Sequence, residues 1–243
     1  MPRLLIIIPT YNEEQGIEKS IDTALTFWRS QRDCQTTIVV ADSSDRDRTR
    51  EIVAKLAAQN PDVGHHEFPD GTGRGEKVRV AAMACPDFDV YASIDSDLPI
   101  AMHEFRAIVA AIEQGADVAA ASKYVPGGSS SRPLHRVVIS KVGNRFFNLF
   151  LRIPVHDFLA GAKAWSRSVN AEVLPTILNN QFFFDTELLY RADRAGKRIV
   201  EIPVHYVDLR VLTSKVGLGK LGLEFARNTY ALLSAERTRP PSS

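Results

Sequence analysis

The chain has 243 residues, of which 44% are hydrophobic and 24% are charged, a composition typical of a globular protein with a substantial core. The 30 Lys and Arg residues against 29 Asp and Glu give a net charge of +1. We expect no nucleic-acid partner, because nucleic-acid binders usually carry a basic excess or stripe. The two cysteines, Cys34 and Cys85, are too few for a disulfide framework, which fits a cytoplasmic protein.

The sequence predicts no membrane-spanning helix and no secretory signal. The first apolar run, residues 4–8, is too short for a signal core, and no segment reaches the ~18 consecutive apolar residues that a spanning helix needs. We therefore expect any contact with a membrane to be made from its surface.

Short, apolar, β-branched segments predict strands, and helical spacing of apolar residues lies between the earlier ones. The predicted strands are residues 4–8, 37–41, 90–94, 118–121 and 198–202. The helical spacing is clearest at Ile17, Ile21 and Leu25, and at Ile52 and Leu56. Strands that alternate with helices and are apolar throughout predict an α/β fold with a mainly parallel central sheet flanked by helices.

One linker-like stretch, residues 126–133, divides a strand-rich first half from a helix-rich second half. We interpret it as a mobile loop inside a single domain of residues 1–238, with a domain boundary as the alternative. The halves would be residues 1–125 and 126–238, and residues 239–243 would be a frayed tail.

Two aspartates follow a predicted buried strand, in the segment Asp95-Ser96-Asp97. Residues two apart in an extended chain point to the same side, so we expect both carboxylates to face one point. At a separation of ~4 Å and an effective dielectric of 20 they would repel by about 4 kcal/mol. A hard divalent cation such as Mg²⁺ would offset that repulsion. The alternative is a pair of loop aspartates that cap the helix beginning near His103.

Polar residues also follow the first two predicted strands, where ligands of such sheets gather. The first strand runs into Pro9-Thr10-Tyr11-Asn12-Glu13-Glu14, and the second into Asp42-Ser43-Ser44. Helix initiation is a sufficient alternative for the former segment, with Asn12 as N-cap, Gln15 completing a capping box, and two glutamates near the positive helix end.

A glycine-rich segment, Gly71-Thr72-Gly73-Arg74-Gly75-Glu76-Lys77-Val78-Arg79, combines flexible backbone with three cations. Glycines allow a close approach to a ligand, and Arg74, Lys77 and Arg79 offer positive charge to a diphosphate. The segment is neither a Rossmann fingerprint nor a Walker loop. A flexible surface turn is an equal alternative.

In this order, these segments resemble motifs of the inverting nucleotide-sugar glycosyltransferases of the GT-A fold, in particular the branch of dolichyl-phosphate mannose synthase and dolichyl-phosphate glucosyltransferase. The resemblance extends from residue 4 to about residue 215. It includes a GSRYVPGG-like segment at 121–128, a DxxSGFRAY-like segment at 157–165 and an FExELLYRA-like segment at 184–192.

The resemblance implies transfer of a sugar from a GDP- or UDP-sugar to a polyprenyl phosphate. It implies that Asp95 and Asp97 hold Mg²⁺ or Mn²⁺ and act in catalysis with Asp157. Residues 1–125 would bind the donor and 126–238 the acceptor. The residues implied in nucleotide-sugar binding are Pro9, Tyr11, Glu13, Asp42, Arg74, Arg79, Asp95 and Ser96.

A lipid phosphate is already anionic, so the resemblance implies basic side chains that hold it in line with the sugar. We expect Lys123, Arg132 and Arg136 in this role, with Arg210 and Lys215 as weaker candidates. Ordinary solvated charge is the alternative for each. Asp157 would orient the sugar or acceptor, or serve as a structural cap. Two further acids, Asp185 and Glu187, would favour the N-terminus of a following helix.

The chain departs from the family pattern at four positions. Pro99 stands in place of a Gln, which leaves metal coordination to Asp95, Asp97 and water. Ala41 replaces one acid of a pair, Lys123 replaces an Arg and gives up bidentate phosphate recognition, and Ala160 replaces a Ser. The metal pair is retained, so we expect activity, while donor preference stays open.

Two predicted helices, residues 140–151 and 218–233, combine apolar stripes with basic residues. The stripes either pack on the core or lie in a membrane interface. The resemblance favours peripheral contact with the cytoplasmic face of a membrane. Trp28 and Trp165 are expected in the core.

Two other functions remain open. One is transfer to a soluble or polysaccharide hydroxyl, which needs a carboxylate base such as Asp157. The other is nucleotide-sugar binding without catalysis.

Overall fold

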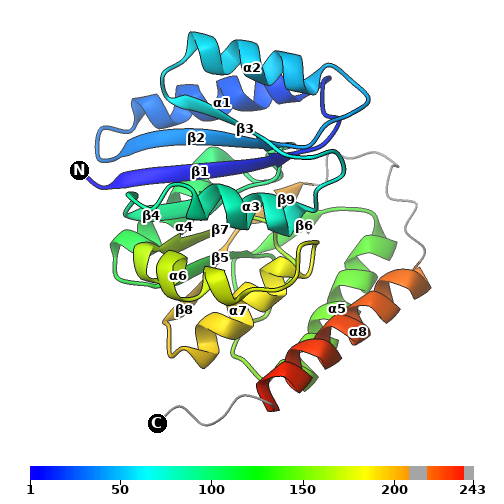
Figure 1. Ribbon diagram of the computed structural model, residues 1–243. Coiled ribbons are helices and arrows are strands. Elements are labelled where there is room, and N and C mark those ends of the chain that lie inside the picture. Colours follow the sequence, from blue (N-terminus) through cyan, green and yellow to red (C-terminus); the bar gives the residue numbers. More distant parts are fainter. Residues whose placement is uncertain (208–217, 238–243) are drawn as a thin grey trace.

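The computed structural model describes residues 1–207 and 218–237 (Figure 1). A seven-stranded sheet forms the centre, in the order β3-β2-β1-β4-β7-β5-β8, and a two-stranded sheet pairs β6 with β9. The strands are β1 (Arg3–Thr10), β2 (Gln35–Asp42), β3 (Val63–Glu67), β4 (Val90–Ser93), β5 (Val118–Ser122), β6 (Ser129–Ser131), β7 (Lys163–Ser166), β8 (Ile199–Pro203) and β9 (His205–Val207).

The sheet is parallel except at β7, which runs antiparallel to both of its neighbours, β4 and β5. Helices flank it on both sides (Figure 1). The helices are α1 (Ile17–Ser30), α2 (Thr49–Gln59), α3 (Arg74–Met83), α4 (Met102–Glu113), α5 (Leu134–Leu151), α6 (Arg167–Glu172), the short 3₁₀ helix η1 (Leu174–Thr176), α7 (Phe184–Arg194) and α8 (Leu218–Arg237). The predicted fold class is confirmed.

Strand β1 explains the two-layered core, because its side chains alternate between the two faces of the sheet. Leu4, Ile6 and Ile8 pack in one apolar cluster with α1, α2 and α4. Leu5 and Ile7 pack in the other, with α3, α5, α6, α7 and α8. All five side chains are at most 1% exposed. The strand is apolar at each of these positions because helices cover the sheet on both faces.

The five predicted strands are confirmed, but β3 and β7 were not predicted. Their sequences, VGHHE and KAWS, carry polar residues that hide the apolar signal. The interpretation of residues 126–133 as a loop is wrong for Ser129–Ser131, which form β6 and pair with His205–Val207. Trp28 and Trp165 lie in the core as expected.

Helices α5 and α8 lie side by side (Figure 1), and each divides its apolar residues between the core and solvent. Phe147, Leu151, Phe225 and Leu232 are buried. Part of each apolar stripe therefore packs on the core, and part of it is exposed to solvent. The large apolar side chains exposed on these helices are Leu134, Val138, Val142, Leu149, Phe150, Leu223 and Tyr230. In the described residues, no helix combines the length and apolar character needed to span a bilayer.

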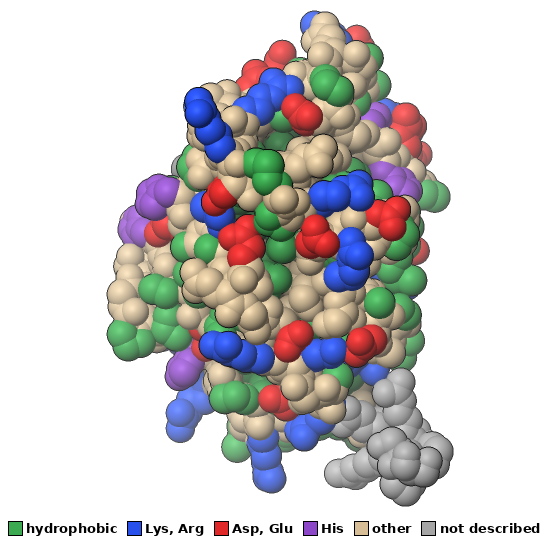
Figure 2. Space-filling model, turned by 90° about the vertical axis from the view of Figure 1, so that its left-hand side faces the viewer, with side chains coloured by type: hydrophobic (Ala, Val, Ile, Leu, Met, Phe, Trp, Pro, Cys, Tyr) green, Lys and Arg blue, Asp and Glu red, His purple; other side chains and the backbone are tan. Residues whose placement is uncertain are grey.

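Acidic and basic side chains are interspersed on the face shown in Figure 2, without a field of one sign. This pattern agrees with the net charge of +1. Arg210, Lys215 and the tail 239–243 lie outside the described residues.

Candidate active site

The carboxyl ends of β1, β2 and β4 meet at one edge of the sheet. Thr10 of β1 is in register with Asp42 of β2, and Ile7 with Ser93 of β4. The backbone N–H of Ile94 extends the β4 pairing by donating to the carbonyl of Ile7 at 3.2 Å. Strand β1 has β2 on one side and β4 on the other, so the strand order reverses at this point, which is where ligands of open α/β sheets bind.

The two aspartates after β4 lie in a tight turn. Strand β4 ends at Ser93, and the N–H of Leu98 donates to the carbonyl of Asp95 at 3.0 Å. Leu98 has a positive φ of 46°. The expectation of an extended chain through Asp97 is therefore wrong, because the chain must turn back at once toward α4.

Arg74, at the first position of α3, holds the first of these aspartates. Its Nε donates to Asp95 Oδ1 at 2.7 Å, its Nη1 to Asp185 Oδ2 at 2.7 Å and its Nη2 to the carbonyl of Gly161 at 3.0 Å. Burial alone would lower the pKa of Arg74, but the carboxylates of Asp185 and Asp95 raise it above its ordinary value. Arg74 was expected to bind a diphosphate, but three of its hydrogen-bond donors are bound to groups of the protein itself.

Gly161 provides the space for this arrangement. A Cβ at this position would lie 2.5 Å from Asp95 Oδ2 and 3.1 Å from Arg74 Nη2. Real Cβ atoms essentially never approach so closely, so only glycine allows the carboxylate to lie against this backbone. The second oxygen of Asp95 therefore lies close to the backbone at Gly161.

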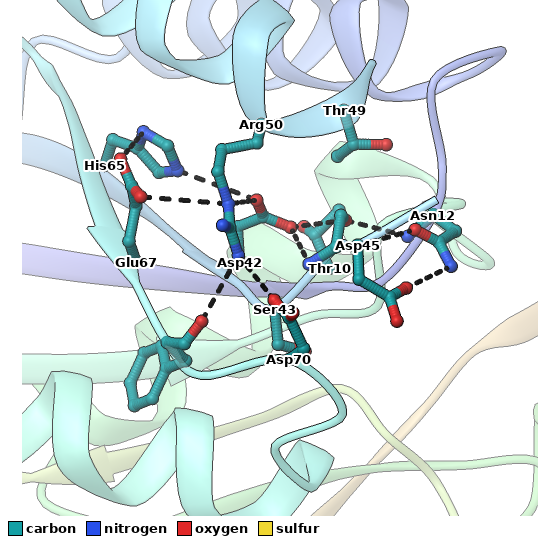
Figure 3. A network of polar contacts seen from close by, with 12 residues as sticks. Thr10, Asn12, Asp42, Ser43, Asp45, Thr49, Arg50, His65, Glu67 and Asp70 are labelled. Atoms are coloured by element: carbon teal, nitrogen blue, oxygen red, sulfur yellow. Dashed lines mark hydrogen bonds and ion pairs between the residues drawn. The ribbon is translucent and has the colours of Figure 1, made fainter. Parts of the chain in front are cut away.

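Asp42 is fully buried in a polar network at the end of β2 (Figure 3). Its Oδ1 accepts from the N–H and the hydroxyl of Ser44, at 3.0 and 2.5 Å. Its Oδ2 lies 3.7 Å from both His65 Nε2 and Arg50 Nε. Burial alone would raise the pKa of Asp42, but His65 and Ser44 lower it below its ordinary value, so the carboxylate is ionised at neutral pH.

The segment after β1 packs against the segment after β2. The side-chain oxygen of Asn12 accepts from the backbone N–H groups of Asp45 and Arg46 at 3.2 Å, and the backbone N–H of Asn12 donates to Ser44 Oγ at 2.8 Å. Asn12 has a φ of 55°, in the region that Asn tolerates better than most residues. The interpretation of Asn12 as an N-cap is wrong, because α1 begins at Ile17 with Gly16 at the N-cap.

The other residues near this end of the sheet that were expected to bind the nucleotide sugar lie as follows. Pro9 is buried in β1, whereas Tyr11 is 42% exposed beside it. The backbone N–H of Glu13 donates to the hydroxyl of Thr49 at 2.8 Å. After β4, Ser96 is 4% exposed.

Lys77 lies at the centre of this edge of the sheet. Its Nζ donates to the carbonyl of Thr10 at 2.6 Å and to Ser43 Oγ at 2.9 Å, so one cation on α3 ties the ends of β1 and β2 together. Burial lowers its pKa to about 8, against the opposing effect of Asp42. The sequence shows the charge of Lys77, but Arg74 and Arg79 were the cations expected to bind the nucleotide sugar. The helical spacing of three from Arg74 was the signal that both side chains point toward the sheet.

The glycines around Arg74 accommodate the protein's own chain. A Cβ at Gly73 would lie 2.0 Å from the carbonyl oxygen of Asn180, and one at Gly75 would lie 2.4 Å from Cβ of Phe184. The interpretation of these two glycines as room for a ligand is therefore wrong. Arg79 is directed to the same segment, since its Nη2 donates to Asn180 Oδ1 at 3.4 Å.

Two residues that were assigned to different roles, Lys123 and Asp157, form one buried ion pair. Lys123 Nζ lies 2.5 Å from Asp157 Oδ2, and the side chains are 2% and 0% exposed. Asn144 of α5 donates to the other oxygen of Asp157 at 3.4 Å. Burial lowers the pKa of Lys123 even though Asp157 opposes the shift. Lys123 was expected to meet an acceptor phosphate directly, and this geometry instead commits it to Asp157.

Arg132 joins the same cluster through two tyrosines. Its guanidinium carbon lies 5.5 Å from the ring centre of Tyr206, on which Lys123 Nζ also lies at 4.8 Å. Its Nη2 donates to the hydroxyl of Tyr124 at 3.2 Å. Arg136 is half-buried in the first turn of α5. The structure therefore brings Lys123, Arg132 and Asp157 together.

Asp185 and Glu187 do lie in the first turn of α7, as expected, but both are buried and paired. Asp185 binds Arg74 and lies 3.2 Å from Lys163 Nζ. Glu187 lies 2.6 Å from Arg191 Nε and accepts from the N–H groups of Leu178 and Asn179. Asp185 and Glu187 therefore do more than favour the N-terminus of α7, because both also connect the helix to other parts of the protein.

The donor atoms at Asp95 and Asp97 suit a hard divalent cation, because Mg²⁺ and Mn²⁺ prefer carboxylate oxygens. The Asp95 side chain is 25% exposed, so it is accessible from solvent. Within residues 1–207 and 218–237, no three His, Cys, Asp or Glu side chains are grouped so as to hold a metal ion. The residues fit such a cation if further oxygen atoms come from outside the protein.

The family model for glycosyl transferase family 2 matches residues 5–174. Over 220 residues the chain is 30% identical to the polyprenol monophosphomannose synthase of Mycolicibacterium smegmatis, covering 88% of the chain and 81% of that protein. It is 29% identical to the undecaprenyl-phosphate mannosyltransferase of Micrococcus luteus, covering 90% of each. It is 33% identical to the glycosyltransferase AglD of Haloferax volcanii, over 83% of the chain, but spans only 32% of that longer protein.

Among solved structures, the glucosyl-3-phosphoglycerate synthase of Mycobacterium tuberculosis, in complex with Mn²⁺, UDP and glucosyl-3-phosphoglycerate, superposes with a TM-score of 0.69. The match covers 99% of the chain and 82% of that structure at 18% identity, which shows the shared fold. With the family match over most of the chain and the parallel sheet described above, the chain belongs to glycosyl transferase family 2 and is a glycosyltransferase of the GT-A fold.

Proposed function

We propose that the chain transfers a hexose from a nucleotide-diphosphate sugar to a polyprenyl phosphate, with the help of a divalent cation. The observation that carries the proposal is the turn after β4, which places Asp95 and Asp97 at the point where the strand order reverses. Relatives that match most of the chain are named as a polyprenol monophosphomannose synthase and an undecaprenyl-phosphate mannosyltransferase, which supports the acceptor class.

Asp95 and Asp97 would hold Mg²⁺ or Mn²⁺, and the ion would neutralise charge on the leaving diphosphate. A related fold has been solved with Mn²⁺ and UDP, which supports a divalent cation and a nucleotide diphosphate. Asp42, with Pro9, Tyr11, Glu13, Ser96 and Lys77, forms the donor side of the site in this proposal. Arg74 and Arg79 would stabilise the protein around the donor site and not bind the donor directly, since they donate to Asp185 and Asn180.

A phosphate acceptor agrees with the state of Asp157. Transfer to a hydroxyl needs a carboxylate base within reach of the acceptor proton. Asp157 is fully buried and paired with Lys123, so its negative charge is already compensated. A lipid phosphate is anionic at neutral pH and needs no such base. Arg132 and Arg136 would hold the acceptor phosphate, while Lys123 and Asp157 brace the chain behind them.

We propose a single domain that contacts the cytoplasmic face of a membrane through α5 and α8. The exposed apolar side chains on these helices lie among basic residues, a combination suited to an anionic lipid surface. The basic residues that accompany them are Arg136, Lys141, Arg145, Arg152 and Arg227.

The proposal is tested by incubating the purified chain with Mg²⁺ or Mn²⁺, a panel of GDP- and UDP-sugars and a short polyprenyl phosphate, followed by mass spectrometry. We expect a glycosylated polyprenyl phosphate from one donor and no product when EDTA is present. Sugar transfer only to soluble hydroxyl acceptors, or donor binding without transfer to any acceptor, would contradict the proposal.

A further inference from the structure

Arg74 connects three separate segments at the candidate metal site. Its guanidinium donates to Asp95 after β4, to Asp185 in α7 and to the carbonyl of Gly161 before β7. The Arg74 side chain is 10% exposed and that of Asp185 is 7% exposed. Because three donors of one rigid planar group are fixed from three directions, Arg74 cannot turn away without losing two charged hydrogen bonds.

Asp95 is already paired with a fixed positive charge before any cation arrives. Arg74 lies between Asp95 and Asp185, and Lys163 Nζ lies 3.2 Å from the other oxygen of Asp185. These four groups alternate in charge, and Asp97 adds a further negative group two residues after Asp95. A cation that approaches Asp95 alone therefore meets the fixed charge of Arg74, which is held 2.7 Å from the same carboxylate.

A nucleotide diphosphate changes this situation, because it brings further negative charge to Asp95, whose side chain is 25% exposed. We propose that Arg74 is a positioning residue that weakens binding of a free divalent cation at Asp95 and Asp97 and so makes the cation bind together with the nucleotide diphosphate. Asp185 sets the strength of this effect, since it shares the charge of Arg74 with Asp95. The inference rests on the proposed metal site.

This arrangement predicts opposite effects for two substitutions in one ion-pair chain. Arg74→Met removes the repelling charge, and Asp185 keeps Lys163 as its partner. Asp185→Asn leaves the charge of Arg74 to act on Asp95 alone and also leaves Lys163 without its carboxylate. Both variants break the chain, so a purely structural role predicts that both weaken binding.

The experiment measures Mn²⁺ binding to the full chain by calorimetry, without nucleotide and with saturating UDP or GDP. In the unmodified protein we expect the nucleotide to tighten Mn²⁺ binding. For Arg74→Met we expect free Mn²⁺ to bind about tenfold more tightly, with the nucleotide effect reduced by the same factor, because a nearby unit charge is removed. For Asp185→Asn we expect free Mn²⁺ to bind several-fold more weakly.

Two further variants serve as controls, and thermal unfolding checks that every variant is folded. Arg74→Lys keeps the charge and should restore Mn²⁺ binding close to that of the unmodified protein. Glu187→Gln removes a buried carboxylate two residues further along α7 that pairs with Arg191, and should leave Mn²⁺ affinity unchanged. Unchanged affinities, or shifts in the same direction for Arg74→Met and Asp185→Asn, overturn the inference alone. No Mn²⁺ binding to the unmodified protein with UDP or GDP overturns the proposed metal site and this inference together.

Discussion

Lys123 and Asp157 form an ion pair with 2.5 Å between Nζ and Oδ2, and neither side chain is more than 2% exposed. The pair joins the end of β5 to the segment that follows α5, two parts of the chain separated by strand β6 and a long helix. The backbone N–H of Lys123 also donates to Asp157 Oδ2 at 3.2 Å. Because both charges are buried and paired with each other, neither side chain contacts a substrate directly, and the pair affects a substrate only by positioning neighbouring residues.

Removal of one partner of this pair should destabilise the fold more than removal of both. Lys123→Met leaves the carboxylate of Asp157 buried without its cation, which typically costs about 3–5 kcal/mol. The double variant Lys123→Met with Asp157→Leu should recover part of that loss, because no isolated charge remains. Urea unfolding of the two single variants and the double variant measures the difference. Additive losses would show that the two charges are not coupled.

Asp97→Ala should reduce sugar transfer at least about 100-fold, because the proposed cation loses one of its two protein carboxylates. Product formation is followed by mass spectrometry at saturating donor, and the urea midpoint checks the fold. Asp62→Ala is a matched control, since Asp62 forms an exposed ion pair with Arg29 outside the site. Turnover that stays at the level of the control would contradict the metal site.

Lys77 should make stability depend on pH in the alkaline range. Its pKa is lowered by burial to about 8 from an ordinary value of 10.5, so the unfolded chain binds more protons than the folded protein between these values. The free energy of unfolding contributed by Lys77 should therefore rise as the pH increases from about 8 to 10.5. Urea unfolding across this range, compared with Lys77→Met, isolates the effect. Parallel pH profiles for the two proteins would show that the pKa of Lys77 is not shifted.

Much of the central sheet and its proposed ligand-binding edge could be predicted from the sequence. Strands that are covered by helices on both faces are apolar throughout, and such runs are easily recognised. Residues 4–8 and 37–41 give a signal that needs no tertiary information, and the polar segments that follow them mark the edge. Strand β7 could not be predicted, because KAWS becomes a strand only between β4 and β5.

The sequence does not show which charged residues pair with one another in the folded protein. Arg74 and Asp185 are 111 positions apart, and nothing local indicates that their side chains meet. The sequence therefore presented Arg74 as a cation available to a diphosphate. The expectation for Gly75 fails for the same reason, since the segment that fills the space beside it, around Phe184, comes from a distant part of the chain.

Gly75→Ala should destabilise the fold by about 1–3 kcal/mol, because the new Cβ would lie 2.4 Å from Cβ of Phe184 and 2.7 Å from the carbonyl oxygen of Gln181. Gly16→Ala is the matched control, since a Cβ there meets nothing within 4 Å. The measurement is the urea midpoint of each variant. Equal stabilities would show that Phe184 and Gln181 can move aside for the new Cβ, so that the close packing at Gly75 does not stabilise the fold.

Exposed apolar residues of α5 should determine binding to lipid. Leu149 is 67% exposed and Val142 is 65% exposed, so Leu149→Glu and Val142→Glu cost little stability while they place negative charge on the proposed membrane surface. We expect both variants to bind anionic vesicles several-fold more weakly in sedimentation, with sugar transfer to a detergent-dissolved short-chain acceptor retained. Met83→Glu, at a 40% exposed position at the end of α3, should bind vesicles like the unmodified protein. Equal vesicle binding by all three variants would exclude α5 as the lipid-binding surface, because a substitution that adds charge at the point of insertion must weaken insertion there.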